Sequence, residues 1–391
     1  MKWHPNLFSA LREALEVYNR SGVNPEVLLR RMVKEHFRWG SRDRRLIRSA
    51  LYDIIRHWRF YSSMADAFKD TDFATAVLIA YSCHKEMEPP AFLSEIPACP
   101  PLPAWQPHHS YPDWFIESVV EDFGRDEAEG ILEKLNQASL PVIRINTLKI
   151  SPEEFKRKLK EKKYLFRNIS GLPEAVVFDR LYRLTKTRWY REGLFEIQDV
   201  SSQLAGKFID ALPGQTVVDA CAGAGGKTLQ LAAMMQNNGS LYALDVDSKK
   251  LQILKERARR AGVRNIRKVS VVSGEILKKM RSKADIVVTD VPCSGSGTYR
   301  RKPHLKWKFQ MEDWQRVIAV QRQIIDDYSN MVRPGGYLIY ITCSILSREN
   351  DRQVKDFLER HKNFTFVSEQ KLYPPAHDFD GFYMAKLKRE T

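Results

Sequence analysis

The sequence lacks paired cysteines. Its five cysteines are spread over 391 residues, and no two of them form a C-x-x-C pair. This absence argues against a zinc site or a dithiol redox motif, so we predict no metal site. An odd number of distant cysteines is typical of free thiols in a reducing compartment. We therefore predict that all five are unpaired, namely Cys83, Cys99, Cys221, Cys293 and Cys343.

Long apolar runs are also missing. No stretch reaches the roughly 20 apolar residues that a membrane-spanning helix requires. The amino-terminal stretch MKWHPNLFSALREALEVYN contains acidic residues and lacks the apolar core and cleavage site of a secretory signal. We expect a cytoplasmic protein with no membrane partner.

Acidic residues are too few to balance the basic ones. The chain has 63 Lys and Arg against 48 Asp and Glu, which gives a net charge of +15. Such a field attracts polyanions, and nucleic acid is the first candidate partner. Between Arg30 and Arg59 there are ten basic residues and three acids, with Arg42, Arg44 and Arg45 at the centre. Either a solvated helix face or an RNA-backbone contact surface explains this run.

The pattern along the chain predicts three folded parts. Residues 1–87 read as helices, one starting at the pair Asn24-Pro25 and the next capped by Ser41. Repeated prolines make 88–110 a linker. Residues 111–192 alternate helix and strand, which is typical of a small α+β module. Residues 193–391 form the last and largest part.

In this last part, apolar strand-like runs alternate with segments of helical period. Runs that are apolar on both faces are typical of a parallel sheet covered by helices, so we predict a doubly wound, Rossmann-like α/β domain. The predicted strands are Thr216–Ala220, Ser240–Val246, Lys268–Ser273, Asp285–Val291 and Gly336–Thr342. Ligands of such sheets bind beyond the carboxyl ends of the strands.

A glycine-rich loop, CAGAGGKT, follows the first of these strands. Its glycines allow a ligand to approach the backbone, and the start of the next helix attracts an anionic group. A phosphate-binding Walker A loop would need glycine at Cys221, and a dinucleotide-binding loop would need glycine at Thr228. A looser nucleoside-binding loop and a simple tight turn remain. Asp245, at the end of the second strand, could accept hydrogen bonds from ribose hydroxyls.

Two cysteines follow the last two predicted strands. Cys293 comes after the strand that ends near Asp290, and Cys343 comes directly after the strand that ends at Thr342. We expect these strands to be neighbours, which brings both thiols to one crevice. We also expect Lys227 and the positive surroundings to increase the thiolate fraction.

Several motifs together carry a family resemblance: GLFEIQDVSSQL, DACAGAGGKT, ALDVD, DVPCSGSGTYRRKPHLKW, YLIYITCSILSREND and DGFYMAKLKR. In order and spacing they resemble the NOP/Sun family of RNA cytosine-5 methyltransferases, from about Tyr111 to Thr391. The amino-terminal part looks more loosely like the NusB-like domain of the family's bacterial 16S ribosomal RNA methyltransferases. The resemblance implies a class I methyltransferase domain, S-adenosylmethionine as cofactor, RNA (ribosomal RNA first) as partner, and a monomer.

The resemblance also implies roles for residues. Cys343 would be the nucleophile, Cys293 would help to break the enzyme–base bond, and Asp290 would hold the cytosine edge with Lys227 close by. Arg300 and Arg301 would contact phosphates. The cofactor would be bound by Cys221, Ala222, Gly223, Ala224, Gly225, Gly226, Lys227, Asp245, Glu275 and Asp290.

Three positions depart from the family pattern. Gly223-Ala224 stands where Ala-Pro is common, which predicts a less rigid loop. Glu275 is the best match for the acid that contacts adenine, and His304, where an acid is frequent, is predicted to be a surface histidine. Three other functions stay open: a non-catalytic RNA-binding or ribosome-assembly protein, a DNA cytosine-5 methyltransferase in which Cys293 attacks, and an enzyme acting on transfer RNA.

Overall fold

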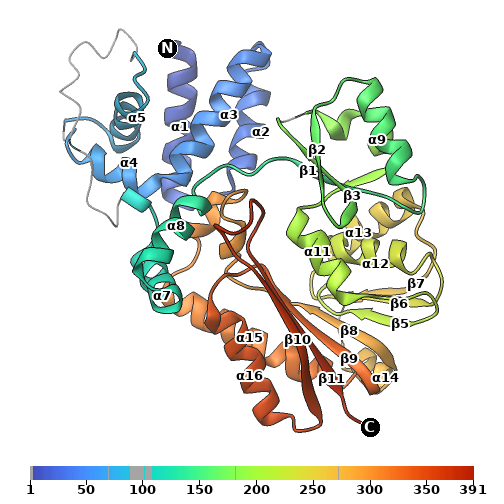
Figure 1. Cartoon of the computed structure of the whole chain (residues 1–391). Helices are drawn as coiled ribbons and strands as arrows, with labels where there is room; N and C mark the ends of the chain where they lie inside the picture. The colour runs from blue at the N-terminus through green and yellow to red at the C-terminus, as the bar shows by residue number, and fades with distance from the viewer. Residues whose placement is uncertain (1–2, 69, 89–100, 102–107, 181, 272) are drawn as a thin grey trace. The chain divides into compact units, whose positions relative to one another are not determined.

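The structure is a computed structural model that describes residues 3–68, 70–88, 101, 108–180, 182–271 and 273–391 (Figure 1). These residues form two compact units, 1–137 with 299–311, and 138–298 with 312–391. The units divide the chain at other places than the predicted domains, because 111–137 and 299–311 belong to the first unit. Most of the predicted linker, 88–110, lies outside the described residues.

The first unit is helical. Its helices are α1 (Pro5–Ser21), α2 (Pro25–Glu35), α3 (Ser41–Arg56), α4 (Trp58–Ala65), α5 (Phe73–His84), α7 (Asp113–Phe123), α8 (Arg125–Leu135) and the 3-10 helix η3 (Pro303–Trp307). The prediction that Asn24 caps a helix is confirmed, since its side chain accepts a hydrogen bond from the Glu26 amide at 2.9 Å. The prediction for Ser41 is wrong. Gly40 is the N-cap of α3, and its own N–H donates to the Asp43 carboxylate at 3.2 Å.

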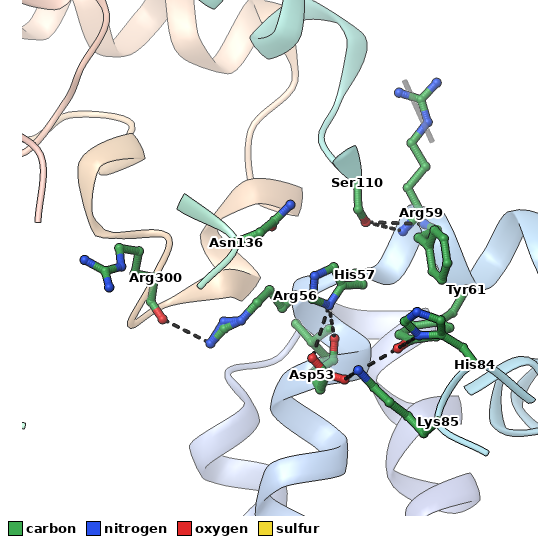
Figure 2. A network of polar contacts seen from close by, with 12 residues as sticks. Asp53, Arg56, His57, Arg59, Tyr61, His84, Lys85, Ser110, Asn136 and Arg300 are labelled. Carbon is green, nitrogen blue, oxygen red and sulfur yellow. Dashed lines mark hydrogen bonds and ion pairs between the residues drawn. The ribbon is translucent and has the colours of Figure 1, made fainter. Parts of the chain in front are cut away.

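A partly buried polar cluster links α3 to α4 and to the end of α5 within this unit (Figure 2). Lys85 Nζ lies 3.0 Å and His57 Nδ1 3.2 Å from the Asp53 carboxylate, and Tyr61 donates to it. Burial alone would raise the pKa of Asp53, but the hydrogen bond and charge of His57 and the charge of Lys85 outweigh burial and lower that pKa. The cluster therefore fixes α3, which carries part of the basic run, against its neighbours.

Residues 299–311 are an integral part of the helical unit. The Arg56 guanidinium donates to the carbonyl of Arg300 at 3.0 Å (Figure 2). Lys306 is fully buried, donates to the carbonyls of Arg56 and Ser110 at 2.9 and 3.3 Å, and contacts the Asn136 amide oxygen. Burial and the charge of Arg56 lower the pKa of Lys306 well below its usual value.

The second unit contains a four-stranded antiparallel sheet in the order β2-β3-β1-β4. This part consists of β1 (Val142–Ile145), α9 (Pro152–Glu161), β2 (Phe166–Ile169), β3 (Leu172–Phe178), η1 (Leu184–Lys186), α10 (Arg188–Arg191) and β4 (Phe195–Ile197). The predicted α+β alternation is therefore present.

A seven-stranded sheet in the order β10-β11-β9-β8-β5-β6-β7 forms the rest of this unit. Its strands are β5 (Thr216–Asp219), β6 (Ser240–Asp245), β7 (Ile266–Val271), β8 (Ala284–Asp290), β9 (Val332–Thr342), β10 (Phe364–Leu372) and β11 (Phe382–Arg389). All five predicted strands are present and pair in parallel. Two further strands, which were not predicted, complete the sheet: β11 pairs antiparallel with β9, and β10 pairs antiparallel with β11.

Helices cover both faces of this sheet, as a doubly wound fold requires. Side chains of α14, α15 and α16 pack against one set of strand residues, and those of α11 and α12 pack against the other set. The helices are α11 (Val200–Ile209), α12 (Gly226–Met234), α13 (Ser248–Ala261), α14 (Gly274–Met280), η2 (Ser296–Thr298), α15 (Met311–Ser329), η4 (Ser347–Glu349) and α16 (Asp351–Arg360). The fold class predicted for this domain is confirmed.

The structure also bears on the predictions for membrane helices and for the cysteines. Within the described ranges, no helix combines the length and the apolar character needed to cross a membrane. Cys221, Cys293 and Cys343 are free thiols, whereas Cys83 is disulfide-bonded. The prediction of five free thiols is therefore wrong for Cys83, and Cys99 lies outside the described residues.

Candidate active site

The two predicted cysteines lie together at the carboxyl ends of neighbouring strands. β8 and β9 are paired in parallel up to Asp290 and Ile341. Cys343 follows β9 directly, and its carbonyl accepts a hydrogen bond at 3.0 Å from the amide of Gly297, in the loop that carries Cys293. The Sγ atoms of Cys293 and Cys343 are 3.3 Å apart. Both sulfurs can therefore reach the same small ligand.

The surroundings of Cys293 favour its protonated form. The hydrogen bond with Cys343 raises the pKa of Cys293 well above its usual value, and burial and the Cys343 charge act in the same direction. The expectation that the positive surroundings would favour a thiolate is thus wrong for Cys293. This thiol keeps its proton and can donate it toward the Cys343 sulfur.

An ion pair with a buried lysine lies at the same strand ends. Lys227, the second residue of α12, donates to Asp290 at 2.7 Å, and its side chain is only 8% exposed. Burial would lower the pKa of Lys227, but the charge and hydrogen bond of Asp290 and the charge of Cys343 raise it. Lys227 therefore stays a cation within electrostatic range of the Cys343 sulfur.

The glycine-rich loop between β5 and α12 is open toward a ligand. Gly223 and Gly225 have φ of +51° and +88°, values that L side chains rarely adopt. A Cβ on Gly223 or Gly226 would meet no atom within 4 Å, so the backbone is accessible there. Together with the amino end of α12, the loop fits a nucleoside-type cofactor with an anionic group.

The acids proposed to contact the cofactor differ in their surroundings. Asp245, at the end of β6, accepts hydrogen bonds from the amides of Gly223 and Asp247 at 2.7 and 2.8 Å. It therefore shapes the glycine loop directly and retains lone pairs for a ribose. Glu275 is exposed in the first turn of α14, and among the contacts of the described residues none joins it to the loop.

Sequence reasoning missed a second support of this loop. Arg257 of α13 donates to the carbonyl of Ala224 at 2.6 Å. Arg257 is held in turn by Glu196 of β4 at 3.0 Å, and Glu196, which also pairs with Arg260, is almost fully buried. These bonds constrain the loop where the family commonly has proline. The available signal in GLFEIQDV was the acid Glu196 between two apolar residues, Phe195 and Ile197.

The arginines proposed to contact RNA all belong to the helical unit. Arg42 and Arg45 are exposed at the start of α3, and Arg44 and Arg301 are partly buried. Arg300 is 3% exposed, which argues against the proposed phosphate contact. His304 is also partly buried rather than on the surface, and burial lowers its pKa to about 4.

Asp219 gives the site a predicted pH dependence of stability. This carboxyl, at the end of β5, is fully buried and accepts one hydrogen bond from Thr228 at 2.6 Å. Burial raises its pKa to about 7, against an unfolded value near 3.9. Between these two values the folded state binds a proton that the unfolded state does not, so the free energy of unfolding falls as pH rises.

We expect Asp219→Asn to remove this loss. The difference in free energy of unfolding, variant minus original protein, should increase by roughly 2–4 kcal/mol from pH 5 to pH 8. Urea unfolding of both proteins at the two pH values measures the change. An identical difference at both pH values would contradict the prediction.

Comparisons with known proteins agree with the site. Residues 207–388 match the family model "16S rRNA methyltransferase RsmB/F", and residues 111–185 match the ferredoxin-like domain model of the same proteins. The probable ribosomal RNA small subunit methyltransferase B of Synechocystis is 30% identical over 302 residues, which are 72% of this chain and 67% of that protein.

Two further matches extend the likeness. The 26S rRNA (cytosine-C(5))-methyltransferase nsun-1 of Caenorhabditis elegans is 30% identical over 317 residues, 72% of this chain and 47% of that protein. The crystal structure of PH0851 matches the whole of both chains with 25% identity and a TM-score of 0.86. The chain therefore belongs to the RsmB/F (Sun) family of methyltransferases, which use S-adenosylmethionine.

Proposed function

We propose that this protein transfers a methyl group to carbon 5 of a cytosine in RNA, with small-subunit ribosomal RNA as the substrate. The observation that carries the proposal is the 3.3 Å separation of the Cys293 and Cys343 sulfurs at paired strand ends. Carbon 5 of cytosine is a weak nucleophile until a nucleophile adds to carbon 6, and a thiolate is suited to that addition. S-adenosylmethionine, when bound at the glycine loop, supplies the methyl group as an electrophile.

Cys343 is the proposed nucleophile. Cys293 keeps its proton and can hydrogen-bond to the Cys343 sulfur, and the Lys227 charge acts on Cys343. Both groups can stabilise negative charge on the Cys343 sulfur. When its Sγ bonds to carbon 6, the electron pair of the 5,6 double bond moves toward carbon 5 and ring nitrogen 3. Asp290 holds the cytosine edge, and Lys227 provides positive charge beside the ring.

Cys293 is proposed to act in release. After methylation, carbon 5 carries both the methyl group and a proton. Transfer of that proton to solvent water leaves its electron pair to restore the 5,6 double bond, and the bond between carbon 6 and the Cys343 sulfur breaks with its pair remaining on the sulfur. Cys293 lies close enough to that sulfur to assist its departure. Each thiol therefore has a separate task in this mechanism. A mechanism in which Cys293 attacks would leave Cys343 without a task.

The proposed RNA contacts are Arg42, Arg44 and Arg45 at the start of α3, and Arg301 of the same unit. Phe37, just before α3, is 70% exposed and could stack on an unpaired base. Arg42, Arg44 and Arg45 together with Phe37 combine the charge and the apolar ring that single-stranded RNA contacts use. A stacked cytosine hides its reacting face, so we expect a target in a loop or an easily opened segment.

Replacing Arg42 and Arg45 together by alanine should weaken RNA binding in a salt-dependent way. Each lost phosphate contact reduces the slope of log affinity against log salt by about 0.7 for single strands, so the slope should fall by about 1.4. Filter binding between 50 and 300 mM salt measures it. Arg20→Ala, at an exposed arginine of α1, is the matched control. An unchanged slope would count against this surface.

The function is tested by incubating the protein with labelled S-adenosylmethionine and unmodified ribosomal RNA, transfer RNA or duplex DNA. We expect label in 5-methylcytosine of small-subunit ribosomal RNA alone. Label in transfer RNA or in DNA would identify that nucleic acid as the substrate in place of small-subunit ribosomal RNA. If no nucleic acid is labelled although the cofactor binds, a non-catalytic role in ribosome assembly replaces the proposal. A monomer acting in the cytoplasm stays part of the proposal, and size-exclusion chromatography tests the first point.

A further inference from the structure

Glu349 is a carboxylate buried between the two cysteine-bearing loops. It ends the short helix η4, six residues after Cys343, and its side chain is fully buried. Its oxygens accept hydrogen bonds from four groups. These are the Ser294 amide at 2.9 Å, the Trp314 indole at 2.9 Å, the Gln321 amide at 3.0 Å and the Ser344 hydroxyl at 3.0 Å.

Two of these donors are the neighbours of the thiols. Ser294 follows Cys293, and Ser344 follows Cys343. Their hydroxyls are 3.3 Å from each other, and Ser296 lies 3.0 Å from Ser344. The amide of Gln321 also donates to the carbonyl of Pro292 at 3.0 Å, on the other side of Cys293. One carboxylate thus fixes both loops at the positions next to the sulfurs.

All four partners are hydrogen-bond donors, so the side chain at position 349 must be an acceptor. A buried carboxylate is costly unless it is hydrogen-bonded, and none of its four donors is charged. A carboxylate offers acceptor sites to all four N–H and O–H groups, whereas an amide would turn one of its two atoms into a donor. An amide at this place would face at least one donor with another donor, which would push the loops apart.

We propose that Glu349 is the positioning residue that holds the Cys293 and Cys343 loops together and keeps their sulfurs within contact distance. The inference rests on the proposed function for its effect on catalysis, but its effect on the thiols does not. Glu349 also adds a negative charge near Cys293, which acts in the same direction as the Cys343 hydrogen bond and favours the protonated Cys293 thiol.

The first measurement is the rate at which the Cys293 and Cys343 thiols couple to form a disulfide, which depends on the distance between their sulfurs. In the full-length protein, diamide oxidises the two thiols to a disulfide and is itself reduced to the hydrazine, and mass spectrometry of the linked peptides gives the rate. We expect Glu349→Gln to slow this coupling by about tenfold and to lower kcat for methyl transfer by about 100-fold, as a displacement near 1 Å can do. The dissociation constant of S-adenosylmethionine should change less than about twofold, because the glycine loop is untouched.

Two further variants make the test decisive. Asp351→Asn is the control, since Asp351 is two residues away and pairs with Ser347 and Lys371 instead. It should retain both rates. Trp314→Phe removes one of the four donors and should slow the coupling severalfold, which decides the matter if Glu349→Gln does not fold.

The inference would be overturned if folded Glu349→Gln, or Trp314→Phe, formed the disulfide as fast as the original protein does. If the original protein methylates no cytosine, the proposed function fails, but the coupling rates still decide the role of Glu349.

Discussion

Cys343→Ala is expected to abolish methyl transfer, whereas Cys293→Ala is expected to stop the reaction one step later. Without the Cys343 sulfur no bond to carbon 6 forms, so the rate should fall by about 10⁴-fold or more. Cys293→Ala keeps the nucleophile but loses the neighbouring thiol at 3.3 Å. It should transfer about one methyl group per protein molecule and then accumulate an RNA adduct.

Denaturing gels with labelled RNA measure the adduct, and labelled S-adenosylmethionine measures the transfer. The double variant should form no adduct, which assigns the bond to Cys343. Binding of S-adenosylmethionine should be retained in all three variants and serves as the test of folding. An adduct in Cys343→Ala together with none in Cys293→Ala would instead support the mechanism in which Cys293 attacks.

The meeting of the two cysteines was predictable because the apolar runs indicate a doubly wound sheet, and in a sheet of this type β8 and β9 are neighbours. β8 and β9 are apolar on both faces, so their parallel pairing follows from the pattern, and residues after their ends must share one edge. The final 3.3 Å was not predictable in this way. It depends on Glu349 and the serines beside each thiol, and no periodicity distinguishes a buried glutamate from an exposed one.

Other features were missed for a similar physical reason. β10 is the edge strand and is exposed along most of its length, so its sequence lacks the continuous apolar run of the central strands. Lys306 and Arg300 are charged residues that read as surface, yet both are buried. Their burial depends on contacts with α3 and Asn136, which are distant in sequence. Long-range packing of polar groups leaves little trace in a single sequence.

Asp290→Asn is expected to lower kcat by about 10²- to 10³-fold, and by more as pH rises. The substitution preserves shape but removes the counter-charge that lies 2.7 Å from Lys227. Asp290 is one of the groups that raise the pKa of Lys227 against the effect of burial, so the variant should have a lower Lys227 pKa. The cation is then lost at high pH, and the deficit should grow between pH 7 and pH 9.

The matched control is Asp285→Asn on the same strand. Asp285 pairs with Arg333 at 2.7 Å near the amino end of β8, away from the thiols. Its substitution should leave kcat within about twofold at every pH, since it touches no reacting group. Lys227→Gln should be as slow as Asp290→Asn, and the double variant little slower than either, because the two residues act as one pair. Independent, multiplying losses with the same pH profile as the original protein would show instead that Asp290 acts without Lys227, by holding the cytosine edge alone.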